Sequence, residues 1–177
     1  MISGASGVGK STVLAKVMEQ RKDLTFSVSA TTRAPRNGET DGVSYYFVSK
    51  EKFLDMIVNN EFLEYDDHMD HYYGTPKGQL EEKLSRGHVL LDIEPNGAFI
   101  VQAARPDAKL IFIAPPSMEE LERRLRSRGD TSEEQIVKRL GRAKWEMEQG
   151  KKYDCYVVNE QVETCAEEIL KIIAEAN

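Results

Sequence analysis

The chain has 177 residues, of which 40% are hydrophobic and 31% are charged, a composition typical of one compact domain with a substantial core. No apolar run approaches the roughly 18 residues that a membrane-spanning helix needs, so we expect no membrane partner. The formal net charge of −6 disfavours the broad basic face that non-specific nucleic-acid binding requires, so we expect no nucleic-acid partner.

The cysteines and the start of the chain suggest a cellular location. Cys155 and Cys165 form no CxxC pair and are too few for a disulfide framework, which suits a reducing compartment. Met1 leads directly into a glycine-rich segment without a basic and then apolar leader, so we expect a cytoplasmic protein. Only residues 1–3 precede that segment, where a longer buried strand is usual. We therefore also expect native residues upstream of Met1.

The predicted elements alternate along the chain in the manner of an α/β protein. They begin with a short strand before Gly4, a helix over 12–21, a strand over 24–30, a turn-rich stretch over 33–41, a strand over 43–48, a helix over 50–59 and a strand over 62–65. They continue with a helix from 75 to about 85, a strand over 88–94, a helix from about 96, a strand over 109–114, helices from about 117 and 132, a strand over 153–159 and a helix over 162–175. Apolar strands that alternate with amphipathic helices indicate a parallel sheet covered on both faces. The stretch before residue 75 resembles an inserted lobe.

The segment GASGVGKS, residues 4–11, has the pattern Gly-x4-Gly-Lys-Ser. Glycines let the backbone curl so that several amide N–H groups point at one anion, and the helix that follows adds its positive end. Lys10 would reach the β and γ phosphates of a nucleotide, and the Ser11 hydroxyl would bind Mg²⁺. A glycine-rich turn without chemical meaning is the alternative, and the flanking strand and helix signals favour nucleotide binding.

Asp92 ends the apolar run VLLD and would lie at the carboxyl end of a strand, where ligands bind in open α/β sheets. It is a candidate for the second Mg²⁺ anchor. The alternative is a carboxylate that caps the next turn.

A kinase differs from a hydrolase in needing a pocket for its phosphoryl acceptor. Arg33 and Arg36 lie three residues apart in a predicted turn, with several hydroxyls close by at Ser29, Thr31 and Thr32. Arginine forks match phosphate oxygens, so this turn is a candidate clamp for a monophosphate. Solvated surface arginines are the alternative. A switch GTPase is disfavoured because no NKxD-type motif follows the phosphate loop.

At these residues the chain resembles a guanylate kinase. The resemblance covers essentially the whole chain, and its most specific motifs are SVSATTRAPR and YYGTP. It implies an α/β three-layer P-loop kinase fold: a parallel sheet core over 1–32 and 75–177, an inserted mixed α+β GMP-binding lobe over 33–74, and a helical lid at about 124–140. We expect the lobe and the lid to close on the nucleotides and exclude water.

The resemblance further implies that ATP phosphorylates GMP, and dGMP as well, with Mg²⁺ as cofactor, in purine nucleotide metabolism and in a monomer or homodimer. The implied ATP-binding residues are Gly4, Ala5, Ser6, Gly7, Val8, Gly9, Lys10, Ser11, Thr12 and Asn159. The implied GMP-phosphate residues are Ser29, Arg33, Arg36, Tyr45 and Tyr73, and the implied guanine readers are Glu64, Thr75 and Glu94. The implied catalytic residues are Lys10 and three arginines of the lid, Arg124, Arg128 and Arg139.

The chemistry of Glu64 supports guanine on independent grounds. The Watson–Crick edge of guanine carries adjacent N1–H and N2–H donors, which one carboxylate can accept, whereas adenine offers an acceptor at N1. An ordinary edge-strand acid is the alternative.

Two segments depart from the family pattern: LLDIEPNGA has Glu94 where an aspartate is usual, and YDDHMDHYYG carries several Asp and His residues. We interpret the second segment as a solvated connection, because ligands of a metal ion must converge.

Two other functions remain open. Guanylate-kinase-like scaffold domains keep the fold but bind phosphorylated peptides, and they can spare the phosphate-loop lysine, which this chain retains as Lys10. A related phosphotransferase could use another nucleoside monophosphate as acceptor. An assay with several acceptors separates these possibilities.

Overall fold

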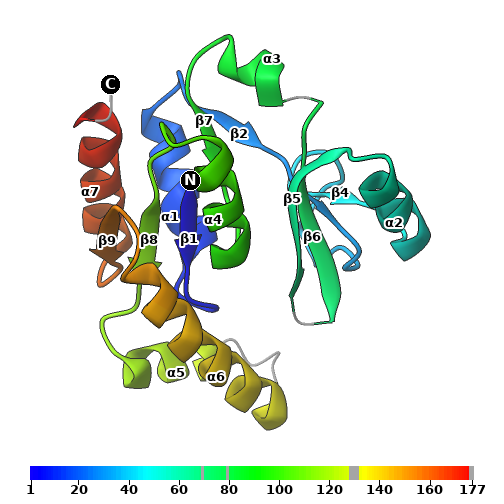
Figure 1. Cartoon of the computed structure of the whole chain (residues 1–177). Helices are drawn as coiled ribbons and strands as arrows, with labels where there is room; N and C mark the ends of the chain where they lie inside the picture. The colour runs from blue at the N-terminus through cyan, green and yellow to red at the C-terminus, as the bar shows by residue number, and fades with distance from the viewer. Residues whose placement is uncertain (69, 79, 128–131, 176–177) are drawn as a thin grey trace. The chain divides into compact units, whose positions relative to one another are not determined.

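The computed structural model describes residues 1–68, 70–78, 80–127 and 132–175. The chain forms two compact units (Figure 1). One unit consists of Met1 and residues 23–108, and the other consists of residues 2–22 and 109–177. We call them the middle unit and the loop unit. The predicted domains, a core over 1–32 and 75–177 and a GMP-binding lobe over 33–74, are defined by substrate binding. That division stays a prediction.

The loop unit is built on a parallel sheet in the order β1-β8-β9, with β1 at Ile2–Gly4, β8 at Ile111–Ala114 and β9 at Cys155–Val158. All four residues of the central strand β8 are buried, as expected where helices cover both faces of a parallel sheet. The helices of this unit are α1 (Lys10–Gln20), α5 (Met118–Ser127), α6 (Glu133–Gly150) and α7 (Val162–Glu175). Helix α6 contacts β1 and β8, while α7 contacts β9 and α1.

The middle unit contains two sheets. Strands β2 (Thr25–Ser27) and β7 (Val89–Leu91) pair in parallel, and a four-stranded sheet has the order β4-β3-β6-β5. The strands of the second sheet are β3 (Ala30–Thr31), β4 (Tyr46–Phe47), β5 (Phe62–His68) and β6 (His71–Pro76). The helices are α2 (Lys50–Val58), α3 (Leu80–Leu84) and α4 (Pro95–Ala104). A small core stabilises the four-stranded sheet, with the rings of Phe53 and Phe62 stacked 4.4 Å apart.

The predicted α/β class is confirmed, and so are several element boundaries. Helix α7 covers the predicted residues 162–175, and the predicted helix start at Ser132 is correct, because its Oγ accepts a hydrogen bond from the amide of Gln135 at 3.3 Å. No helix in the described part of the chain is long and apolar enough to cross a membrane.

Three predictions about the middle unit are wrong in detail. The strand over 24–30 divides into β2 and β3, which belong to different sheets. Thr75 lies in β6 and not in a helix, and the polar segment of Asp66 and His71 belongs to a β5–β6 hairpin and not to a connection. The antiparallel pairing of β5 with β6 accounts for both results, because it includes Thr75 opposite Glu64 and Tyr73 opposite Asp66.

Candidate functional site

The phosphate loop begins where β1 ends, at Gly4, and gives way to α1 at Lys10. Two of its glycines adopt left-handed backbone angles, with φ of 91° at Gly7 and 93° at Gly9. At Gly7, a Cβ atom would lie 2.5 Å from Cδ2 of Leu125, so both the backbone and the space require glycine. The sequence therefore folds the loop into a tight curl at the head of a helix.

The first turn of α1 is suited to an anion. Within the described residues, no side chain caps this turn and it contains no acidic residue. The partial positive charge of its N–H groups is therefore not neutralised by a nearby side chain. Ser11 and Thr12 are exposed, and Lys10 is half-buried beside them. These groups together can bind phosphate oxygens, as the motif predicts.

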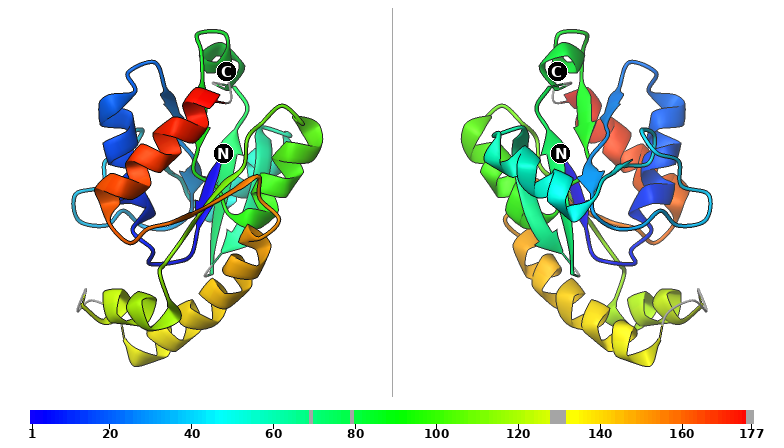
Figure 2. Two further views of the ribbon diagram at one scale, coloured as in Figure 1. Left: turned by 90° about the vertical axis from the view of Figure 1, so that its left-hand side faces the viewer. Right: turned by 90° about the vertical axis from the view of Figure 1, so that its right-hand side faces the viewer.

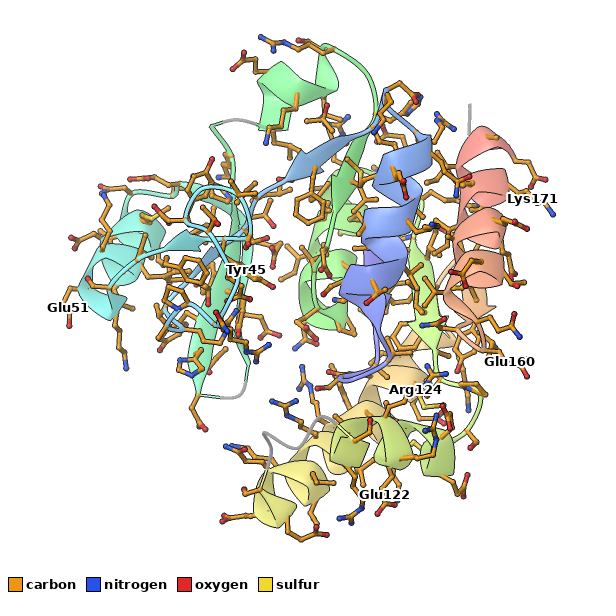
Figure 3. The ribbon with its side chains drawn as sticks, turned by 180° about the vertical axis from the view of Figure 1, so that it is seen from behind. Tyr45, Glu51, Glu122, Arg124, Glu160 and Lys171 are labelled. Atoms are coloured by element: carbon orange, nitrogen blue, oxygen red, sulfur yellow. The ribbon has the colours of Figure 1, made fainter. Side chains whose placement is uncertain are left out.

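Two side chains, those of Asn159 and Arg124, hold the phosphate loop at Val8. Asn159 follows β9 and is buried, and its Nδ2 donates to the carbonyl oxygen of Val8 at 2.8 Å. Arg124 of α5 donates through Nη1 to the carbonyl oxygens of Val8 at 3.3 Å and of Asn159 at 3.0 Å, and it lies beside Glu160 in Figure 3. The Oδ1 atom of Asn159 is buried and accepts no hydrogen bond from the described residues. The predicted adenine and phosphate contacts of these two residues stay predictions.

The predicted lid, at about 124–140, covers the end of α5 and the first part of α6, and these two helices pack against each other. Arg126 of α5 forms ion pairs with Glu122 and with Glu133 at the start of α6, so the two helices are tied at that end. Arg139 lies half-buried on α6, and Arg128 lies outside the described residues. The structure thus places two of the three predicted lid arginines in the loop unit.

In the middle unit, Arg33, Tyr45 and Tyr73 lie together as predicted. The Arg33 guanidinium lies 5.5 Å from the ring centre of Tyr45, and the Tyr45 and Tyr73 rings meet edge to face at 5.9 Å. Arg33 also forms a bidentate pair with Glu39, at 2.8 and 2.9 Å. Burial opposes the charge, but hydrogen bonds to Glu39 and Tyr73 raise the pKa of Arg33 on balance. Arg33 therefore stays protonated, and the Glu39 carboxylate offsets part of its charge.

The other two predicted clamp residues differ in exposure. Ser29 is buried, between β2 and β3, and its carbonyl oxygen accepts from the amide of Tyr46 at 2.9 Å. Arg36 is exposed, and its backbone N–H donates to Glu39 at 2.7 Å. Glu39 thus links the backbone of one predicted arginine to the side chain of the other.

The three predicted guanine readers also lie in the middle unit. Glu64 of β5 is buried and accepts a hydrogen bond from the Thr75 hydroxyl at 2.5 Å. Gly97, in the first turn of α4, lies so close to the Glu64 carboxylate that any side chain there would overlap it. Glu94 occupies the N-cap position of the same helix. Carboxylate oxygens and one hydroxyl therefore meet at the start of α4.

Burial raises the pKa of Glu64 to about 7; the Thr75 hydrogen bond opposes this shift, while the nearby charges of Asp66 and Glu94 add to it. A carboxyl group that titrates near neutral pH is typical of a functional site.

The two predicted Mg²⁺ ligands belong to different units. Asp92 directly follows β7 and is half-buried, while Ser11 lies in the first turn of α1. A carboxylate and a hydroxyl are the hard oxygen ligands that Mg²⁺ prefers. Among the described residues, no three His, Cys, Asp or Glu side chains are grouped to hold a metal ion, and this includes the hairpin residues Asp66 and His71.

Sequence reasoning missed two acidic residues at these sites. Glu39 lies six residues after Arg33, and its proximity to two arginines was the available signal. Glu146 of α6 is buried and accepts a hydrogen bond from the amide of Ser6, inside the phosphate loop, at 2.9 Å. It shares the buried face of α6 with Ile136, Ala143 and Gly150, so a charged residue within an apolar stripe was the signal for it.

A glycine loop at the head of a helix, in a parallel α/β unit, defines a P-loop nucleotide-binding protein. The guanylate kinase family model matches residues 1–176. The chain is 49% identical to a guanylate kinase of Thermus thermophilus, over 98% of this chain and 79% of that one, and 45% identical to one of Prochlorococcus marinus, over 98% and 95%. The crystal structure of guanylate kinase from Anaplasma phagocytophilum has a TM-score of 0.83 and 36% identity, over 99% of this chain and 84% of that one. The chain belongs to the guanylate kinase family and has its P-loop kinase fold.

Proposed function

We propose that this protein transfers the γ-phosphoryl group of ATP to GMP, and also to dGMP, in the purine nucleotide metabolism of the cytoplasm. Membership of the guanylate kinase family makes it an ATP:GMP phosphotransferase. The observation that carries the choice of acceptor is the buried Glu64–Thr75 pair, in the same unit as the Arg33 clamp. The first can read a base and the second can hold a monophosphate.

The loop unit would bind ATP. Residues 4–12 would surround the phosphates with backbone N–H groups, and Lys10 would contact the β and γ phosphates. Asn159 would accept a hydrogen bond from the adenine amino group, which its buried Oδ1 atom supports. Arg124 would support the loop and contact the phosphates, together with Arg128 and Arg139.

Mg²⁺ would be held by Ser11 and Asp92 together with phosphate oxygens, and it would neutralise charge on the bound phosphates. The hard oxygen atoms of these two residues fit this ion. Lys10 and the arginines supply the remaining positive charge from the chain itself.

The middle unit would bind GMP. Ser29, Arg33, Arg36, Tyr45 and Tyr73 would donate to the phosphate oxygens. Glu64 would accept from N1–H and N2–H of guanine, with Thr75 and Glu94 beside it. Adenine would set its N1 lone pair against the carboxylate, and leaving that buried group unpaired would weaken binding by about 1–3 kcal/mol or more.

The attacking group would be an oxygen of the GMP phosphate. Its second pKa of about 6 leaves it largely ionised at neutral pH, so no general base is needed. Two anions must instead be held in line while charge on the transferred group is neutralised. Lys10 and Arg139 would supply this positive charge, and Arg33 would hold the acceptor.

A direct assay tests the proposed function. ATP is supplied with GMP, dGMP, AMP or UMP in turn, and ADP formation is followed by a coupled reaction. We expect turnover with GMP and dGMP, and at least about 100-fold lower kcat/KM with AMP and UMP, because neither base offers Glu64 an adjacent pair of donors. Preference for AMP or UMP would indicate another acceptor, and no turnover with any acceptor would indicate a binding domain.

The pKa of Glu64 leads to a pH dependence of GMP binding. GMP requires the ionised carboxylate, whereas the empty site holds a proton on Glu64 below a pH of about 7. We expect the Kd for GMP to rise about tenfold between pH 8 and pH 6, because a proton must be released on binding. For the same reason, this group contributes stability to the empty protein below a pH of about 4.5 that is lost as the pH rises through 7.

Calorimetry at several pH values measures this effect. The variant Thr75→Val removes a hydrogen bond that lowers the pKa of Glu64, so its pH midpoint should move upward. The variant Glu61→Gln changes an exposed acid just before β5 and should keep the original midpoint. If the pH midpoint of GMP binding is the same in the Thr75→Val variant as in the wild type, the assignment to Glu64 is contradicted.

A further inference from the structure

Glu146 is a buried carboxylate that touches the phosphate loop. Only 1% of its surface is exposed, and its Oε2 atom accepts a hydrogen bond from the Ser6 amide at 2.9 Å. Its Oε1 atom accepts from Nε of Arg142, one turn earlier in α6, at 3.1 Å. The guanidinium of Arg142 in turn stacks on the ring of Trp145, at 4.2 Å. One amide of the loop is thus directed at a carboxylate.

This arrangement opposes anion binding if charge alone is considered. A buried carboxylate is costly unless it is paired, and a negative charge beside a phosphate loop repels phosphate. Arg142 offsets both effects. The benefit of Glu146 must therefore be geometric: it fixes the first half of the loop so that the amides after Ser6 are already in place for an anion.

The same helix is firmly attached to the sheet. Gly150 lies against the ring of Phe112 in β8, and Tyr153, just after α6, donates to the Ser3 hydroxyl in β1 at 2.6 Å. Figure 2 shows α6 as one continuous helix from its start beside α5. A displacement of its anchored end would therefore be transmitted along its length.

Arg139 lies on the Glu146 side of α6. Arg139, Arg142 and Glu146 are spaced by three and four residues, which places them on one helical face. The step of seven residues from Arg139 to Glu146 corresponds to about two turns, or about 10 Å along the axis. The contact at Ser6 is therefore one of the anchors that set the height and rotation at which Arg139 is presented.

We propose that Glu146 is a positioning residue for phosphoryl transfer: it holds the Ser6 amide and aligns α6, and with it Arg139, to the phosphate loop. The proposal rests on the proposed binding of ATP by this loop. Loss of the contact should weaken ATP binding through the loop and slow transfer through Arg139, while the GMP site in the middle unit is unaffected.

Three substitutions at Glu146 separate geometry from charge. Glu146→Ala removes the acceptor, and we expect KM for ATP to rise and kcat to fall by about tenfold each, the effect of losing a hydrogen bond to a charged group. Glu146→Gln keeps an oxygen within reach of the Ser6 amide but turns its NH₂ group toward Nε of Arg142, so KM for ATP should recover in part and stay below that of the alanine variant. Glu146→Asp keeps the charge but shortens the reach, so it should resemble the alanine variant. KM for GMP should change by less than about twofold in all three.

Glu148→Ala is the matched control, because Glu148 lies on the same helix but is exposed and pairs only with Lys151 among the described residues. It should match the wild type. If the alanine variant does not fold, the other two variants decide. A lower KM for ATP in Glu146→Gln than in Glu146→Asp supports positioning, and a lower KM for ATP in Glu146→Asp overturns it. The proposal is also overturned if KM for ATP and kcat are unchanged in the alanine variant, or if KM for GMP rises as much as KM for ATP. Failure of the wild type itself to phosphorylate GMP would instead refute the proposed function.

Discussion

Replacing Lys10 by alanine is expected to lower kcat with ATP and GMP by a factor on the order of 10³ or more. Lys10 is the first residue of α1, at the end of a loop whose other proposed phosphate donors are backbone N–H groups and the hydroxyls of Ser11 and Thr12. Its charge should be most valuable when negative charge moves onto the β–γ bridging oxygen during transfer. The loss should therefore appear mainly in kcat, with a smaller rise in KM for ATP.

The fold should tolerate this change. Alanine is a good helix former and Lys10 is half-buried, so we expect the melting temperature to change by less than about 3 °C. Lys16→Ala is the control on the same helix, since the Lys16 side chain is 41% exposed and pairs with Glu19 at 3.6 Å. Steady-state kinetics and a thermal melt of both variants are sufficient. Equal activity of the two variants would exclude Lys10 from the catalytic centre.

The phosphate loop could be predicted from the sequence because its conformation depends on neighbours in the chain. Gly7 and Gly9 adopt positive φ, and α1 begins directly after them, as the glycine spacing requires. The start of α6 was predictable for the same reason, since the Ser132 hydroxyl caps an amide only three residues away. Such local hydrogen bonds leave a direct signature in residue order.

The β5–β6 hairpin and the burial of Glu146 depend on contacts between distant segments. The polar residues of β5, Asp66 and Asp67, carry no apolar alternation that would distinguish a strand from a loop. Their register follows from tertiary pairing, with Glu64 opposite Thr75. The burial of Glu146 depends on Ser6, 140 residues away in the chain. No local pattern specifies such a partner.

Replacing Glu64 by alanine should lower kcat/KM for GMP by about 10²–10⁴, because two hydrogen bonds from guanine to one carboxylate are lost at about 1.5–3 kcal/mol each. KM for ATP should stay within about twofold, since the proposed ATP site contains no residue of β5. Glu61→Gln, at an exposed acid just before β5, should leave both constants unchanged. An alanine variant that loses ATP and GMP affinity equally would mean that Glu64 supports the fold and does not read the base.

The glutamine variant at this position sharpens the test. Glu64→Gln keeps the size of the side chain but replaces one acceptor by an NH₂ donor, which would face a donor of guanine. Thr75 donates to Oε1 of Glu64, so the amide oxygen is expected to stay toward Thr75 and the new donor to point at the base. We therefore expect Glu64→Gln to impair GMP use about as strongly as alanine does, while removing the pH dependence that the carboxyl group causes. A glutamine variant with near-normal GMP kinetics would show that shape alone, and not the acceptor pair, selects guanine at this site.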